Sequence, residues 1–106
     1  MLLESLELKK EINGMDTRYM YKIIETDYRG NSAYGISVSR EYIKDNKVID
    51  VYEDSIKYIS PIKDKVEALL ETLYKGQVSP IHLVDIAGEY VDNCVNDFCK
   101  LDKIAG

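Results

Sequence analysis

The chain has 106 residues, of which 45% are hydrophobic and 31% charged, so it can build one hydrophobic core but not two. Nineteen acidic residues against fourteen basic ones give a net charge of -5, which repels nucleic-acid backbones, so no nucleic-acid partner is expected. We expect a single domain over 1–106, made of a β-rich part at 5–59, a helical hairpin at 61–98 and a frayed C-terminal tail at 99–106.

The expected compartment follows from the N-terminal residues and the cysteines. The first residues contain neither the basic stretch nor the apolar segment of an export signal, so none is expected. No apolar run is long enough to cross a membrane, so no membrane partner is expected either. Cys94 and Cys99 are five positions apart in a helical pattern, which cannot close a disulfide within one helix. The sequence therefore predicts a cytoplasmic protein.

The first half of the chain places apolar residues at every second position, which is typical of β-strands. Leu6 and Leu8 alternate with charged residues, so residues near the N-terminus form either an edge strand at 5–12 or a short helix. Residues 18–27 predict a central strand that is apolar on both faces, and so they do not show which face is covered. Further strands are predicted at 34–42 and from Val48 onward, with short turns that favour an antiparallel meander.

The second half has the period of helices, and a Ser-Pro pair begins each one with a capping residue and a first-turn proline. The first helix is predicted at 61–75, with Gly76 ending it and an apolar stripe at Ile62, Val66, Leu69 and Leu73. The second is predicted at 80–98, where Val78 and Leu83 occupy the positions of a hydrophobic staple. Its packing stripe is predicted at Ile81, Val84, Gly88, Val91, Val95 and Phe98.

Strands followed by helices predict an α+β fold. We expect a three- or four-stranded antiparallel β-meander followed by a C-terminal antiparallel helical hairpin packed on one sheet face. Gly88 lies within the predicted packing stripe, where a missing side chain favours close approach of another backbone.

His82, Asp85 and Glu89 are the candidate metal ligands. Their spacing places an imidazole and two carboxylates on roughly one helix face, where they could hold a divalent ion. The alternative is a first-turn histidine followed by a solvated acidic stripe, which a helix N-terminus favours in any case.

The motifs of common catalytic and cofactor chemistries are missing. His82 and Cys94 are separated by about 18 Å of predicted helix, which prevents a nucleophile–base pair within one subunit. A glycine-rich stretch at 30–37 lacks the lysine of a phosphate loop. We therefore expect no catalytic residues and no cofactor.

The nine tyrosines are the most unusual feature of the composition. Tyrosine suits strands that span core and solvent, and it is also enriched at protein interfaces. Besides a role in the core, Tyr19, Tyr21 and Gly88 are thus candidate interaction residues, and a homodimer could cover the sheet face that the helices leave open.

The stretch Val78-Ser79-Pro80-Ile81-His82-Leu83-Val84-Asp85-Ile86 resembles a family of short uncharacterised proteins of anaerobic Gram-positive bacteria, a domain of unknown function. The resemblance covers roughly residues 18–98 and implies a bacterial, cytosolic setting without an activity. His82 and Asp85 belong to the most specific segment, and they could pair with each other or with Arg40 to fasten the helices to the sheet.

The leading functional hypothesis is a small protein-interaction or regulatory module without catalytic activity, which binds another protein or a second copy of itself. The alternative is a metal- or small-ligand-dependent enzyme that uses His82, Asp85 and Glu89.

Overall fold

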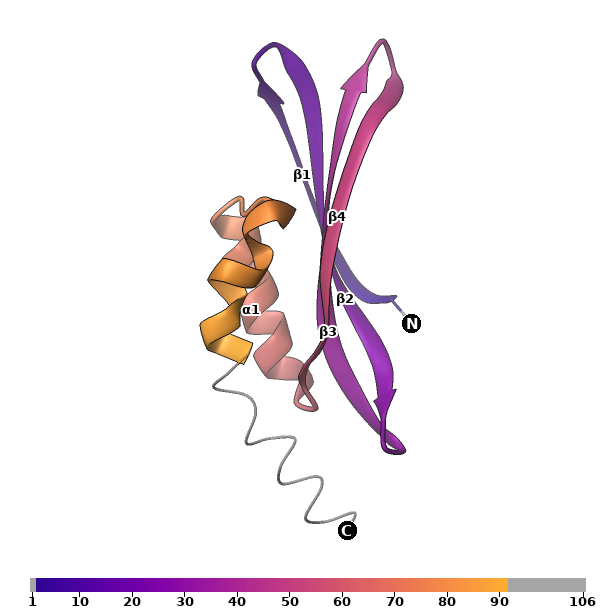
Figure 1. Ribbon diagram of the computed structural model, residues 1–106, viewed down its shortest axis with the longest axis vertical. Helices are drawn as coiled ribbons and strands as arrows, with labels where there is room; N and C mark the ends of the chain where they lie inside the picture. Colours follow the sequence, from indigo (N-terminus) through magenta and orange to yellow (C-terminus); the bar gives the residue numbers. More distant parts are fainter. Residues whose placement is uncertain (1, 92–106) are drawn as a thin grey trace.

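A computed structural model describes the backbone of residues 2–91 and the side chains of residues 5–91. Four antiparallel strands form one sheet in the order of the sequence: β1 (Leu2–Ile12), β2 (Met15–Tyr28), β3 (Asn31–Lys44) and β4 (Lys47–Ser60). α1 (Lys63–Lys75), the short 3₁₀ helix η1 (Pro80–His82) and a helical segment at 83–91 follow (Figure 1). The predicted meander with a C-terminal helical hairpin is confirmed, and the N-terminal segment is a strand rather than a helix.

Two-residue turns connect the strands, because each turn carries residues that tolerate a positive φ. Asn13-Gly14 and Arg29-Gly30 have φ values of 52° and 78°, and of 51° and 83°. The third turn, Asp45-Asn46, has φ values of 52° and 61°. Two successive positive φ values give a twist that matches paired strands, so these turns produce tight hairpins.

The helical hairpin lies on one face of the sheet (Figure 1). That face carries Tyr19, Tyr21 and Ile23 of β2 and their neighbours Ile36 and Val38 of β3. From the helical side the core receives Val66, Leu69, Leu70, Leu73, Val78, Leu83 and Ala87. The opposite face is mostly polar and includes Lys22, Ser37, Ser39 and Glu41. The structure thus decides which face of β2 is covered.

The first helix begins at Lys63, two residues later than predicted. The Ser60 hydroxyl accepts a hydrogen bond from the Ile62 N–H at 3.0 Å, so it caps the turn before the helix rather than the helix itself. Ile62 therefore lies outside the helix and is 42% exposed, whereas the other members of its predicted stripe are buried.

The packing face predicted for the second helix is wrong at its start, although Val91, a later member of the predicted stripe, does pack against the core. Ile81 and Val84 are 52% and 54% exposed, while Leu83 and Ala87 are fully buried. The staple explains the difference: Val78 and Leu83 both enter the core, so the face one helical turn after Leu83 carries Ala87. The rest of this predicted helix and the predicted tail lie outside the described residues.

Gly35 and Gly88 have opposite surroundings. At Gly35, β4 bulges between Ile56 and Ser60, and the backbone carbonyls of Ile56 and Lys57 occupy the space that a Cβ atom would need. At Gly88 no atom of a more distant described residue lies within 4 Å of the position that a Cβ atom would take. The close backbone approach predicted at Gly88 thus occurs at Gly35 instead.

Candidate functional site

The two tyrosines predicted as interaction residues lie in the core. Tyr19 is 4% exposed and Tyr21 is fully buried. The Tyr21 hydroxyl donates a hydrogen bond to the Val78 carbonyl at 2.9 Å, and its ring meets the Tyr74 ring edge-on with centroids 5.8 Å apart. Both side chains fasten the helices to the sheet and offer no surface to a partner.

Burial also changes the acidity of Tyr21. Desolvation is the main cause that raises the pKa of Tyr21 from 10.0 to about 12, and the nearby Tyr19 and Tyr74 add to it. The phenol therefore keeps its proton, and its hydrogen bond, wherever the protein is folded near neutral pH.

His82, Asp85 and Glu89 are all exposed, and the structure does not gather them into a metal site. Within the described part of the chain, no three His, Cys, Asp or Glu side chains come close enough to hold an ion. The reason is that η1 ends at His82, so the regular helical spacing assumed for the three residues begins only after it.

Arg40 does fasten the helical hairpin to the sheet, but through a different residue from the two predicted. Its Nη1 donates to the Ser79 hydroxyl at 3.4 Å, whereas the backbone N–H of His82 donates to the Ser79 carbonyl at 2.9 Å. The Arg40 guanidinium also lies 4.8 Å from the Tyr42 ring centroid and 5.9 Å from that of Tyr52. Arg40 thus joins the end of the helical hairpin to a pair of tyrosines on β3 and β4.

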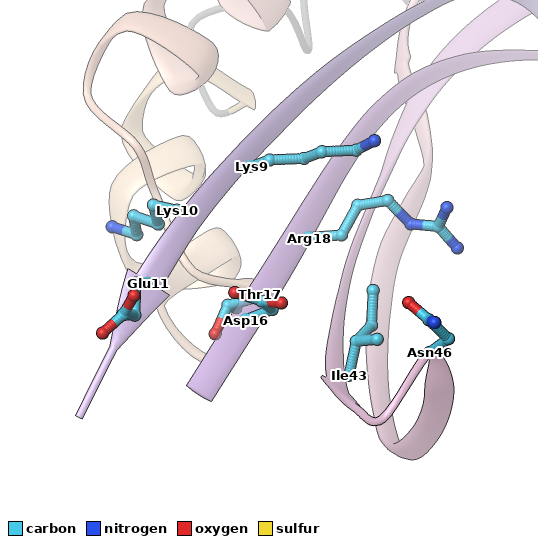
Figure 2. A pocket seen from close by; sticks show the side chains of 8 residues that line it. All are labelled: Lys9, Lys10, Glu11, Asp16, Thr17, Arg18, Ile43 and Asn46. Carbon is cyan, nitrogen blue, oxygen red and sulfur yellow. The ribbon is translucent and has the colours of Figure 1, made fainter. Parts of the chain in front are cut away.

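A charged hollow of about 450 Å³ lies near the ends of β1 and β2. Figure 2 shows Lys9 and Arg18 pointing to one side of the sheet and Lys10 to the other. Arg18 is bound by Glu41, with 2.6 Å between Arg18 Nε and Glu41 Oε1, and Lys10 Nζ donates to Gln77 Oε1 at 3.0 Å. These cations are engaged within the protein, so the hollow does not provide a free anion site.

The helix-bearing face of the sheet continues beyond the end of the helices. A strand of fourteen residues spans about 46 Å, whereas a helix of thirteen residues spans about 20 Å. The helical hairpin ends where Gln77 and Ser79 meet Lys10 and Arg40, and the strands extend past it (Figure 1). We call the apolar side chains at and beyond this point the uncovered end of the sheet: Ile12, Met15, Tyr42, Ile49 and Tyr52. Ile12 forms its inner border, since it also packs against the core.

The uncovered end has the shape and composition of a contact surface. Four of its residues, with Asn13 and Asp50, line a hollow of about 310 Å³. Ile49 and Tyr52 are 52% and 44% exposed. Next to it, η1 contacts β4 and β3, so the exposed Ile81 and Val84 lie at the start of the helix that borders this surface. Neighbouring exposed apolar side chains make this surface a candidate interaction site.

β4, which forms one edge of the sheet, is apolar in the same region. Val48 and Val51 are 47% and 54% exposed, beside Ile49 and Tyr52. Sequence reasoning missed these residues as a site, although a signal was present. Apolar residues at both odd and even positions of this strand cannot all enter a core when helices cover only one face.

The comparisons with known proteins support one part of the sequence resemblance, namely a family of unknown function. A model described as a family of unknown function (DUF6514) matches residues 2–93, which is most of the chain. The chain belongs to this family. No curated protein and no solved structure matches it. Among the described residues, no helix is long and apolar enough to span a membrane.

Proposed function

We propose that the protein is a protein-interaction module without catalytic activity, and that its partner adds an extended strand to β4. The contact surface comprises the outer edge of β4, the uncovered end of the sheet and the outward side of the second helix. The single observation that carries the proposal is the run of exposed apolar side chains on an edge strand: Val48, Ile49, Val51 and Tyr52.

The two edges of the sheet support strand addition at β4 rather than at β1. The outward positions of β1 that the structure describes are Ser5, Glu7, Lys9 and Glu11, which are polar and exposed. Charged edge strands resist pairing with another chain, whereas long apolar ones favour it. β4 has fourteen residues and no proline before its end, so its free N–H and C=O groups are available to a partner strand.

Matched variants test this proposal. Val51→Lys places a charge in the middle of the β4 edge, and Ile62→Lys makes the same change at an exposed residue outside the surface. We expect wild type and Ile62→Lys to retain the same protein from a native lysate, and Val51→Lys to lose it. The purified partner should then slow hydrogen exchange in β4 but not in β1. Equal retention by Val51→Lys would overturn the proposal.

The setting of this module remains a prediction from the sequence. We propose a bacterial cytoplasm, which the family resemblance and the low number of cysteines, two in 106 residues, support. Fractionation of native cells followed by immunoblotting tests it, with recovery in the membrane or secreted fraction as the contrary outcome.

A further inference from the structure

We infer that the partner strand is β4 of a second copy of this chain, paired antiparallel about a two-fold axis near Val51. This inference rests on the proposed function and specifies its partner. An isologous contact uses the same patch twice, so its register must be self-complementary, and the charges along β4 can be compared for each register.

Most registers oppose like charges. A two-fold axis at Asp50, Glu53 or Asp54 would place each carboxylate directly opposite its own copy, which is destabilising. An axis at Tyr52 would place Asp50 opposite Asp54 of the second copy, so two carboxylates would face each other on both sides of the axis. These four registers are therefore disfavoured.

An axis at Ser55 would pair Glu53 with Lys57 of the second copy. However, the pairing of β3 with β4 shifts between the partners of Ile36 and Tyr34, so β4 bulges just after Ile56. The backbone of Lys57 turns over Gly35 at this point. A strand that leaves its straight path there cannot continue an intermolecular ladder.

An axis at Val51 avoids both problems. Val51, which is more exposed than the apolar residues Val48, Ile49 and Tyr52 of the same strand, faces its own copy, and Asp50 faces the Tyr52 side chain of the second copy. The ladder with β3 passes from Asp50 to Val48 and skips Ile49. Because of this bulge, Lys47 falls opposite Asp54 of the second copy, and the two-fold axis repeats that ion pair.

The same register covers the other exposed apolar groups. A two-fold axis perpendicular to the sheet places both helical hairpins on one face of a continuous sheet. Tyr52 of one copy then neighbours Asp50 of the second copy. Within that second copy, Asp50 pairs with Tyr42, which belongs to the uncovered end. Since η1 contacts β4, Ile81 and Val84 of one copy approach the uncovered end of the second.

Cysteine cross-linking tests the register directly. In a background with Cys94→Ser and Cys99→Ser, Val51→Cys places two thiols opposite each other at the axis, and mild oxidation should convert most of the protein to a disulfide-linked dimer. Glu7→Cys, on the exposed part of β1, is the matched control and should remain monomeric on non-reducing gels. Equal cross-linking of the two variants would overturn the register.

Light scattering after size exclusion tests the dimer itself. We expect wild type and Ile62→Lys to have twice the chain mass of 12.2 kDa, and Val51→Lys to have the mass of one chain, with circular dichroism showing all three folded. A monomeric wild type at high micromolar concentration would overturn the second copy as partner. In that case the lysate experiment separates the two ideas. If the wild type retains a different protein that Val51→Lys does not retain, the proposed function stands without self-association. If Val51→Lys retains everything that the wild type retains, the proposed function and the dimer both fail.

Discussion

Two pairs of tyrosines on the same sheet face have opposite environments. Tyr19 and Tyr21 lie beneath the helical hairpin and are 4% and 0% exposed. Tyr42 and Tyr52 lie beyond its end, where Tyr52 is 44% exposed and Arg40 stacks against both rings. The side chains are chemically identical, so the reach of the helices decides which tyrosines build the core and which remain accessible to solvent.

The second helix shows the same division around its circumference. Leu83 and Ala87 complete the core, whereas Ile81 and Val84 face solvent. A surface helix is normally apolar along one stripe only. A helix that is apolar on two sides, next to an apolar edge strand, is the feature that the proposed contact surface would explain.

The largest expected effect compares one tyrosine from each pair. Tyr21→Ala removes a fully buried ring and should lower the free energy of unfolding by about 3–5 kcal/mol. Tyr52→Ala should lower it by less than about 1 kcal/mol, because the ring is already partly in solvent. Urea unfolding at dilute protein concentration measures both values without a contribution from self-association. Equal losses would contradict the division of the face into covered and uncovered parts.

The bulge that bends β4 should be nearly as sensitive. Gly35→Ala forces a methyl group against the Ile56 and Lys57 carbonyls and should cost about 3 kcal/mol, since backbone has to move. Thermal unfolding followed by circular dichroism detects the change. A variant as stable as wild type would show that the strand end can shift without cost.

A smaller effect is expected from the Tyr21 hydroxyl. Tyr21→Phe keeps the ring but removes the hydrogen bond to the Val78 carbonyl, which should cost about 1 kcal/mol near neutral pH. The folded pKa of about 12 exceeds the ordinary value of 10.0, so the unfolded chain loses this proton first as pH rises. The stability linked to this group is therefore complete below pH 10.0 and is lost as pH rises toward about 12.

The direction of this pH dependence is tested by comparing the unfolding free energies of wild type and Tyr21→Phe. Wild type and Tyr21→Phe share every other titrating group, so the gap between their unfolding free energies isolates Tyr21. We expect the gap to be largest below about pH 10 and to shrink at more alkaline pH. A gap that widens with pH would contradict the raised pKa.

The smallest effect is a gain. Gly88→Ala adds a methyl group in open space and removes backbone freedom from the unfolded chain, so it should stabilise the fold by about 0.5–1 kcal/mol. Measured by the same thermal unfolding, Gly88→Ala is the matched control for Gly35→Ala, because it makes the same substitution at a glycine with open surroundings. Destabilisation by Gly88→Ala would show that another backbone does approach this glycine.

Most of the fold could be predicted because local chemistry specifies it. The hairpin turns and the alternation of Tyr34, Ile36 and Val38 each depend on neighbours in sequence. The Ser-Pro pairs precede the two helical segments as predicted, but neither serine caps a helix with its side chain. The first helical stripe was predicted correctly at Val66, Leu69 and Leu73. The start of the second stripe, at Ile81 and Val84, was not, because it competes with a second apolar face on the same helix and periodicity cannot rank two faces.

The candidate surface was harder to predict. Tyr19 and Tyr21 were chosen for composition, yet pairing and burial place them in the core. Val51 and Tyr52 lacked any motif, since an unprotected edge exists only once the strand order is known.

By itself the sequence determined the α+β class, the meander and the positions of its turns, because hydrophobic periods and turn residues act over a few neighbours. Only the tertiary structure decided which face of β2 is covered, which side of the second helix packs inward, and where the helices stop along the sheet. Those outcomes depend on contacts between distant segments, such as Tyr21 with Val78 and Arg40 with Ser79, whose geometry no local pattern records.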